Sequence, residues 1–347
     1  MFDWGNTLMR VFPQYSGPMA SWPQVETLPG AAQALKDLAP AYNLAVATNA
    51  SDSDAENVRA ALRRGGLDEF IQHVFTAQEL GRARKPDISF YRTVETALDV
   101  RSESLVMVGD TLRTDIIGAV AAGWRAVWFN PDALPATGLL PLHDAEVMEL
   151  GELPRVLQSL TLPGWSTCID WLAAQGATHY LLQHVQLVAA VAYQLAQWLR
   201  ASGVSVDPLL AHRGGLLHDL MKPHELKESG RHRDHGVLAA ENLAARGQPA
   251  LGEIARRHPL FCIFTDDRRP VTWEQKLVYF ADKLVEHGQI SPLEIRVQAL
   301  RLRYPQDADR IQACAPEVYA LQDEICSLLQ FSPDDLIQRL QAAAYRA

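Results

Sequence analysis

The hydrophobic pattern of the chain changes near residue 160, and this change constrains the fold more than any other feature of the sequence. Before that point, short apolar runs such as "YNLAVATNAS", "SLVMVGDT" and "RAVWFN" alternate with helical stretches such as "DAENVRAALRRGG". This alternation predicts a parallel sheet with helices on both faces. After the Pro-Gly break in "TLPGW" the pattern is almost entirely helical, as in "YLLQHVQLVAAVAYQLAQWL". We therefore expect an α/β domain followed by an all-α domain.

A chain of 347 residues is long for one hydrophobic core and suits two domains. The pattern places the α/β domain at residues 1–160, a linker at 161–169 and the main helical domain at 170–300. Amphipathic stretches such as "DDLIQRLQAA" continue the helical pattern over residues 301–347. We expect these last helices to pack on the second domain or on another copy of the chain, as in a homodimer.

The composition disfavours several classes of protein. The sequence has no run of about 18 uncharged apolar residues and no basic segment that leads into an apolar stretch at the N-terminus. We therefore expect a cytoplasmic protein without a membrane span. The four cysteines lack C-x-x-C spacing, which disfavours a disulfide framework or a thiolate zinc site. The net charge of -9 disfavours a broad nucleic-acid-binding surface.

Polar side chains gather where the predicted strands end, which is where open parallel sheets bind ligands. The candidates are Asp3 after the first apolar run, Thr48 and Asn49 after "LAVA", Asp110 after "LVMVG", the nearby Asp115, and Lys85 in "RKPD". The three carboxylates together can hold Mg²⁺, and the other three residues can bind phosphate. Only two residues precede Asp3, so we expect a shortened first strand or a natural start further upstream.

Four segments of this domain resemble the ordered motifs of the haloacid dehalogenase-like phosphatases: "FDWGNTL", "VATNAS", "RKPDISFY" and "VGDTLRTDIIGAVAAG". The resemblance covers about residues 1–160 and implies a Rossmann-like fold. It also implies that Asp3 is a nucleophile that forms an aspartyl-phosphate. Thr48 and Lys85 would bind phosphate, and Asp110 and Asp115 would be carboxylates of a magnesium site.

One position departs from the pattern of this family. Its phosphatases usually carry a second aspartate two residues after the nucleophile, which protonates the leaving group and then activates water. Here that position is Gly5. Loss of a general acid/base costs about 10²- to 10⁴-fold in rate, and some relatives that do other chemistry also lack this aspartate. We expect a phosphate site with impaired turnover; the alternative is a decayed phosphatase that is retained as a scaffold.

The spacing of the motifs leaves little room for the lid domain that many relatives insert. Asp3 and Thr48 are 45 residues apart, and Thr48 and Lys85 are 37 apart. An open site favours large substrates or a partner domain that covers it.

Histidines and acids lie on helical faces of the second part that should be buried. The apolar stripe of "YLLQHVQLVAAVAYQL" includes His184. "GGLLHDLMK" places His218 and Asp219 after an apolar pair, and "EQKLVYFADKLVE" places Asp282 on another inward face. Because unpaired buried carboxylates are costly, a shared metal would resolve the conflict. The alternative is a set of hydrogen-bonded core residues without a metal.

The order H…HD…H…H…D resembles the HD-domain metal-dependent phosphohydrolases over about residues 170–300. The resemblance implies that one metal is bound by His184, His218, Asp219 and Asp282. His235 and His258 match the further ligands of members that hold two metals, with Asp219 as the bridge, and Lys222 matches a lysine that contacts substrate phosphate. Such imidazole and carboxylate ligands suit Mn²⁺, Fe²⁺, Co²⁺ or Ni²⁺, with Zn²⁺ as a further option.

The other polar residues of this part have weaker assignments. We expect four histidines at the surface or behind the metal ligands: His212, His224, His232 and His287. Four arginines either gather phosphate near the mouth of the site or are exposed charges without a role: Arg256, Arg257, Arg268 and Arg269.

Together these features predict a two-domain phosphohydrolase. The helical domain would hydrolyse a phosphoester or phosphoanhydride of a nucleotide or a related phosphorylated metabolite, and the first domain would be a second, Mg²⁺-dependent phosphatase. The substrate is not specified, since these folds host many functions. The alternative is a regulatory or binding protein whose first domain senses a phosphorylated ligand and whose second metal site is structural.

Overall fold

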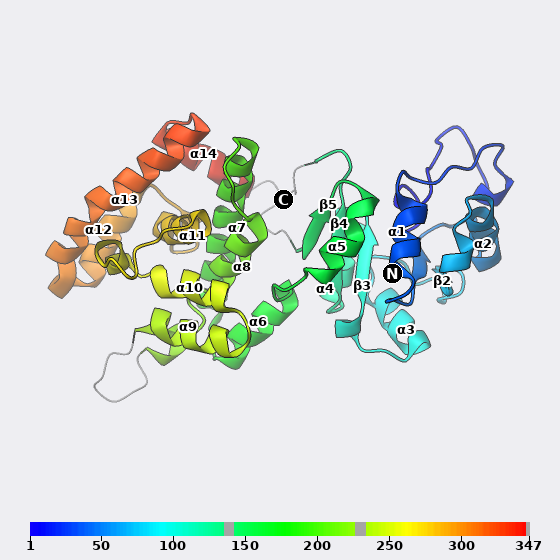
Figure 1. The fold of residues 1–347 in the computed structure, drawn as a ribbon. Coiled ribbons are helices and arrows are strands. Elements are labelled where there is room, and N and C mark those ends of the chain that lie inside the picture. Colours follow the sequence, from blue (N-terminus) through cyan, green and yellow to red (C-terminus); the bar gives the residue numbers. More distant parts are fainter. Residues whose placement is uncertain (135–141, 226–233, 345–347) are drawn as a thin grey trace. The chain divides into compact units, whose positions relative to one another are not determined.

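The computed structural model describes residues 1–134, 142–225 and 234–344 (Figure 1). They form two compact units, one made of residues 1–134 and 142–166 and the other beginning at Thr167. The division falls inside the segment predicted as a linker. Helix α6 (Trp165–Ala174) begins there, so the structure places a helix start, rather than extended chain, over the second half of that segment.

The first unit contains a parallel sheet. Its strands are β1 (Ala45–Thr48), β2 (His73–Thr76), β3 (Val106–Gly109), β4 (Arg125–Phe129) and β5 (Ala145–Val147). β1 pairs with β2, and β3 pairs with β4, which pairs with β5. Phe2 forms parallel bridges to Val46 and to Val108 and so joins the two groups. The segment that carries Asp3 therefore lies between β1 and β3 as a very short central strand.

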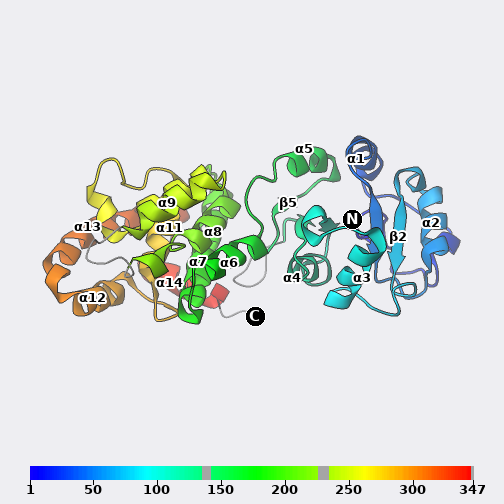
Figure 2. The ribbon, with the colours of Figure 1, turned by 90° about the horizontal axis from the view of Figure 1, so that it is seen from below.

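Helices cover both faces of this sheet. They are α1 (Ala31–Leu38), α2 (Ala55–Arg64), α3 (Ile88–Leu98), α4 (Gly118–Ala121) and α5 (Leu153–Gln158), with short turns η1 (Met19–Ser21), η2 (Asp68–Phe70), η3 (Ser102–Ser104) and η5 (Leu150–Glu152). Apolar residues of α1, α2 and α5 share one core with Phe2, Val46 and Val108. Figure 2 shows α3 and α4, which contact each other, on the opposite side of the sheet from α1 and α5. This is the predicted α/β Rossmann-like fold.

The second unit is helical apart from a small hairpin of β6 (Val285–Glu286) and β7 (Gln289–Ile290). After α6 its helices are α7 (His179–Ala201), α8 (Pro208–Leu217), α9 (His235–Ala245), α10 (Pro249–Arg257), α11 (Trp273–Leu284), α12 (Leu293–Arg303), α13 (Ala308–Leu329) and α14 (Pro333–Ala344), with short turns η6 (Lys222–His224), η7 (Leu260–Phe264) and η8 (Pro305–Asp307). The predicted all-α class is confirmed. Among the described residues no helix combines the length and apolarity that a membrane crossing needs.

The core of the second unit is built around α7, α8 and α11. The stripe residues Val185, Val188 and Leu195 of α7 are fully buried, and several of them share a core with Val278 of α11. Residues of α13 and α14, including Cys314, belong to the same core. The C-terminal helices therefore pack on this unit of their own chain.

A glycine allows the two central helices to approach closely. A Cβ atom at Gly215 of α8 would lie 2.5 Å from the Cα atom of Ala189 in α7. Because that neighbour is backbone, relief requires the helices to move apart. This contact also lies three residues before His218, so it positions the His-Asp pair.

We expect Gly215→Ala to lower the stability of the helical unit by about 1–3 kcal/mol or more, because the added methyl group overpacks the helix contact. Urea unfolding followed by the circular dichroism of the helices measures this effect. Gly151→Ala is the control, since a Cβ atom there meets no atom within 4 Å. Equal unfolding midpoints for the two variants would show that the close contact does not constrain the packing.

Candidate functional site

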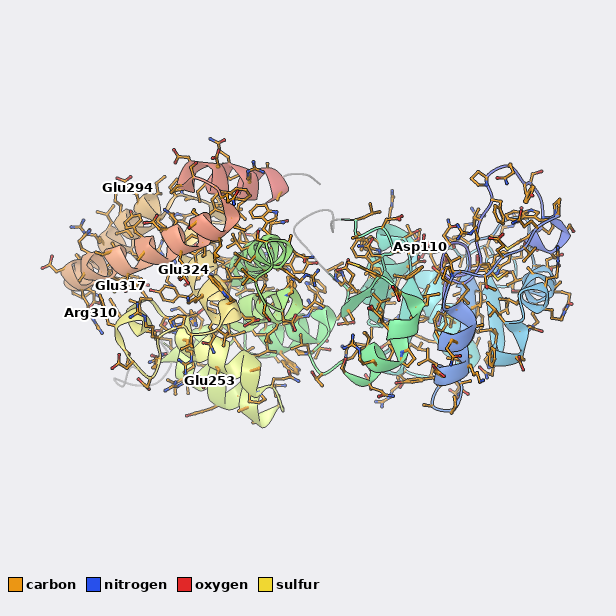
Figure 3. All side chains as sticks on the ribbon, turned by 45° about the horizontal axis from the view of Figure 1, so that its top comes forward. Asp110, Glu253, Glu294, Arg310, Glu317 and Glu324 are labelled. Carbon is orange, nitrogen blue, oxygen red and sulfur yellow. The ribbon has the colours of Figure 1, made fainter. Side chains whose placement is uncertain are left out.

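The first unit brings three carboxylates together at the carboxyl end of its sheet. Asp3 follows Phe2, Asp110 follows β3, and Asp115 lies in the π-helical turn η4 (Leu112–Ile117). Each offers an oxygen within 4.8 Å of the others, and Figure 3 labels Asp110 within this unit. The Nζ atom of Lys85 lies 2.7 Å from an oxygen of Asp3 and 2.7 Å from an oxygen of Asp115. Four residues predicted from three separate segments therefore converge on one site.

Local backbone features place Asp115. A Cβ atom at Gly109 would lie 2.4 Å from Oδ2 of Asp115, so only glycine leaves room for this carboxylate. The backbone N–H of Thr111 donates to Oδ2 of Asp115 at 3.0 Å. The hydroxyl of Tyr91 donates to the carbonyl of Thr114, within the π-helical turn. Turns of this type are rare and occur often at functional sites.

The two residues after β1 differ in what they contact. Asn49 donates from Nδ2 to the carbonyl of Lys85 at 2.8 Å and accepts from the Lys85 N–H at 2.9 Å. Its amide therefore holds the backbone of Lys85 and is not presented to a ligand. The hydroxyl oxygen of Thr48 accepts from the N–H of Ala50 at 3.1 Å, which leaves its own proton to donate.

The electrostatics of this cluster favour a cation. Burial raises the pKa of Asp115 to about 6, the Asp3 carboxylate adds to the rise, and Lys85 opposes it. Burial and Asp3 also raise the pKa of Asp110. Burial alone would lower the pKa of Lys85, but Asp3 and Asp115 raise it, so the lysine stays charged. Three oxygen ligands and one lysine leave an excess of negative charge, and the donor set fits Mg²⁺.

The loop after Asp3 carries no acid in the segment "WGNTL". The hydroxyl of Thr7 donates to Oδ1 of Asp110 at 3.0 Å. Asn6, not Gly5, is the residue of this loop with a left-handed backbone, at φ 55°. A Cβ atom at Gly5 would lie 3.0 Å from the Cγ2 atom of Val11, so the space for a side chain there is limited by one neighbour and not by backbone strain.

The helical unit brings together six candidate metal ligands from five different elements. His184 lies on α7, His218 and Asp219 directly follow α8, His235 is the first residue of α9, His258 directly follows α10, and Asp282 lies on α11. Asp234 caps α9 by accepting from the N–H of Gly236 at 2.9 Å, which fixes where His235 starts its helix.

The six side chains form overlapping groups of three. Oδ1 of Asp219 lies 3.0 Å from Nε2 of His235 and 3.3 Å from Nε2 of His258. Oδ2 of Asp219 lies 3.6 Å from Nε2 of His218. Oδ1 of Asp282 lies 3.2 Å from Nε2 of His184. Asp219 thus stands between the two groups of histidines, as a bridging carboxylate would.

The charges of this cluster are those of ionised acids among buried imidazoles. Burial alone would raise the pKa of Asp219, but the hydrogen bonds of His235 and His258 hold it well below its ordinary value. Burial lowers the pKa of His218 to about 3, so this imidazole is neutral. Asp219 and Glu225 raise the pKa of His235 to about 9 against the effect of burial, so a metal would displace its proton. Neutral imidazoles and ionised carboxylates are the forms that bind transition metals.

One buried atom shows directly that the donor set fits a metal. Nε2 of His218 is buried and has no hydrogen-bond partner among the described residues. Its other nitrogen, Nδ1, lies 2.7 Å from the carbonyl of Gly215. His258 is held in the same way at 2.6 Å by Ala255, and His235 at 3.0 Å by Glu225. These outer contacts turn the Nε2 atoms toward the cluster, as is usual for metal-binding histidines.

A cavity of about 820 Å³ opens over this cluster. Five cationic side chains line it: Lys222, Lys283, Arg296, Arg303 and Arg310. Tyr180 and Tyr304 also line it. Figure 3 labels Arg310, which comes from α13. Of these, only Lys222 is among the residues predicted from the sequence, although the spacing of Arg296 and Arg303 by two helical turns in "EIRVQALRLR" is a usable signal.

The weaker assignments are resolved in part. The four arginines proposed for the mouth do not line the cavity. Three form ion pairs with acids away from it, Arg256 with Asp267, Arg257 with Glu253 and Arg269 with Glu317, and Arg268 pairs with Asp234, which does line it. His287 is exposed at the hairpin. His212 is fully buried in α8, and not at the surface. His224 is partly buried, and His232 lies outside the described residues.

Comparison with known families agrees with the site found in each of the two units. The haloacid dehalogenase-like hydrolase family matches residues 4–129, and the HD domain family matches residues 181–313. The chain thus combines a haloacid dehalogenase-like hydrolase domain with an HD domain. The HD match extends past the predicted boundary at residue 300 and includes α12, which contributes arginines to the cavity.

Three curated relatives illustrate the similarity. An uncharacterized protein of Methanocaldococcus jannaschii is 30% identical over 43% of this chain and 90% of its own length. A ribulose-1,5-bisphosphate 5-phosphatase of Halopiger xanaduensis is 34% identical over 31% of this chain and 44% of its own length. A pyrimidine 5'-nucleotidase of Streptococcus pneumoniae is 33% identical over 32% of this chain and 46% of its own length. This chain spans less than half the length of the two phosphatases.

We expect the reconstituted protein to bind close to two Mn²⁺ ions in its HD domain, because two of its three-residue ligand groups, one with His184 and His218 and one with His235 and His258, share Asp219. Elemental analysis after gel filtration measures the content. His235→Ala should retain about one ion fewer, whereas the control His287→Ala should match the wild type, since this imidazole is 71% exposed. Wild-type protein that retains no metal after reconstitution would contradict the assignment.

Proposed function

We propose that the HD domain hydrolyses a phosphoester or phosphoanhydride of a nucleotide or a related phosphorylated metabolite. One observation supports this most directly: five of the six convergent metal ligands line a cavity that five lysine and arginine side chains also line. Cations above a metal cluster suit a phosphate group, whose charge both would neutralise. Tyr180 and Tyr304 add aromatic surface to the same cavity, which suits a ring such as a nucleobase.

The residues of the chain have distinct roles in this proposal. His184, His218, Asp219, His235, His258 and Asp282 would hold two metal ions, which would acidify bound water and polarise the phosphoryl group. Lys222 would neutralise a phosphate oxygen, and Glu225 positions it with an ion pair of 2.7 Å. Glu225 also contacts Nδ1 of His235, so one carboxylate orients both a ligand and a substrate-binding lysine.

For the first domain we propose a second, Mg²⁺-dependent phosphatase with impaired turnover. Asp3 would attack phosphorus, Thr48 and Lys85 would bind the phosphoryl oxygens, and Asp110 and Asp115 would hold the ion with Asp3. Asn49 would act by positioning Lys85. The names of relatives as phosphatases of ribulose bisphosphate, glyceraldehyde 3-phosphate and pyrimidine nucleotides support phosphomonoester chemistry as the general class.

The missing acid also favours a second candidate function, in which the first domain binds a phosphorylated ligand without turning it over. In that case the domain would sense a metabolite and leave catalysis to the HD domain. A regulatory protein with a structural HD metal site is the extreme form of this alternative. Measuring whether each domain hydrolyses phosphate compounds distinguishes the catalytic, sensing and regulatory functions.

We expect Asp3→Asn to remove the phosphatase activity that survives loss of the HD metals, because no other nucleophile is placed in that site. It should leave most of the HD activity, which Asp282→Asn should remove in turn. Assays of both full-length variants on a panel of phosphomonoesters and phosphoanhydrides test this division. Loss of all activity in Asp3→Asn would show that the HD domain is not the main catalyst.

A further prediction concerns Gly5. Without an acid/base at this position, Asp3 should take a phosphoryl group from p-nitrophenyl phosphate, whose leaving group needs little protonation, and the aspartyl-phosphate should then hydrolyse slowly. We expect a burst of nitrophenol followed by a slow steady rate. Gly5→Asp should accelerate turnover by about 10²-fold or more.

The new side chain meets Val11, so the test includes Gly5→Ala and the double variant Gly5→Asp with Val11→Ala. Gly5→Ala should show the steric effect alone, without faster turnover. Rapid wild-type turnover of unactivated phosphomonoesters through Asp3 would refute the prediction and mean that another group supplies the proton.

A further inference from the structure

A buried glutamate on the hairpin of the HD domain holds two arginines of the cavity wall. Glu286 ends β6 and is only 5% exposed. Its Oε2 atom pairs with Arg296 and its Oε1 atom pairs with Arg303, both from α12. Together the three residues carry one net positive charge. We call them the α12 clamp.

The α12 clamp lies directly beside the metal ligands. The Nη2 atom of Arg296 is 3.9 Å from Oδ1 of Asp282, and that same oxygen is 3.2 Å from Nε2 of His184. Both arginines line the cavity. A phosphate group on the metal cluster would therefore have a cationic neighbour within the length of one further phosphate.

The arginines of the α12 clamp have more N–H donors than the carboxylate of Glu286 engages. The two oxygens of Glu286 engage one nitrogen of each arginine, although a guanidinium carries five N–H donors. The Nε atom of Arg296 has no acceptor among the described residues. The side chain of Arg303 remains 38% exposed, so it is accessible to a ligand in the cavity. A purely structural role in pinning the hairpin would need neither the second arginine nor its exposure.

We propose that the α12 clamp is a second anion subsite, so that the HD domain selects substrates with a further phosphate or similar anionic group next to the scissile one. Arg296 and Arg303 bind that group, and Glu286 positions them. The selected class is phosphoanhydrides and compounds with adjacent phosphates, in preference to simple monoesters. This inference rests on the proposed function of the HD domain and narrows its substrate.

Two non-hydrolysable probes test the subsite: methylphosphonate, with one anionic group, and methylenediphosphonate, with two. Calorimetric titration of the Mn²⁺-loaded full-length chain gives both affinities, and metal analysis afterwards confirms that the ions remain bound. Binding to the first domain is common to all variants, so the differences between variants report the HD cavity. The variants are Arg303→Gln, Arg303→Lys and Arg301→Gln. Arg301 is the matched control, because it lies on the same helix, binds Gln312 at 3.0 Å and does not line the cavity.

We expect the wild type to prefer methylenediphosphonate by at least about tenfold, and Arg303→Gln to reduce that preference about tenfold, as for loss of a charge-assisted hydrogen bond. Arg303→Lys should restore part of it, and Arg301→Gln should retain it. Equal preferences in Arg303→Gln and Arg301→Gln, or a wild type that retains metal and binds both probes equally, would overturn the subsite alone. A wild type that retains no metal would overturn the proposed function, and the subsite with it.

Discussion

The burial of two carboxylates, Asp219 and Asp282, is the constraint on which the HD domain depends. Each is almost completely inaccessible and keeps its charge. Burying a charge without partners costs several kcal/mol, so the surrounding helices must supply cations or donors. Imidazoles arrive from four separate elements, and Lys283 contacts both Asp282 and the carbonyl of His258. Helix packing and metal binding are therefore parts of one arrangement.

The first domain meets the same constraint in a different way. There a buried lysine stands between Asp3 and Asp115 and compensates two of the three acids within the chain. In the HD cluster, by contrast, Nε2 of His218 has no partner among the described residues, and two Nε2 atoms of His235 and His258 approach to 3.0 Å. A buried imidazole nitrogen without a partner is unfavourable unless a cation binds it. Metal binding should therefore stabilise the HD domain more than Mg²⁺ stabilises the first domain.

The two fold classes and the residues that converge in each domain are predictable from the sequence, because its hydrophobic pattern indicates both the type of each element and the face on which a polar residue lies. Periodicity placed His184 and Asp282 on inward faces, and strand ends placed Asp3 and Asp110 together. The sequence does not show that Asn49 contacts the backbone of Lys85. The sequence around a residue near a phosphate site is the same whether its side chain points toward the ligand or toward the backbone. The sequence also left His212 open between surface and interior, since its burial depends on helix α7, which packs across α8.

The arginines of the cavity wall carry a much weaker sequence signal than the metal ligands, and the cause is physical. The metal ligands lie on helices whose apolar stripes mark their inward faces, so a polar residue there is conspicuous. α12 has only one buried apolar residue, Leu293, and its arginines look like ordinary solvent-exposed charge until the fold places Glu286 beneath them. The candidate metal ligands thus lie on or directly after the core helices α7 to α11. The groups that we propose distinguish one phosphate compound from another come from α12, which the His and Asp pattern does not reach. We therefore expect the substrate preference of this domain to depend on the segment whose hydrophobic pattern is weakest.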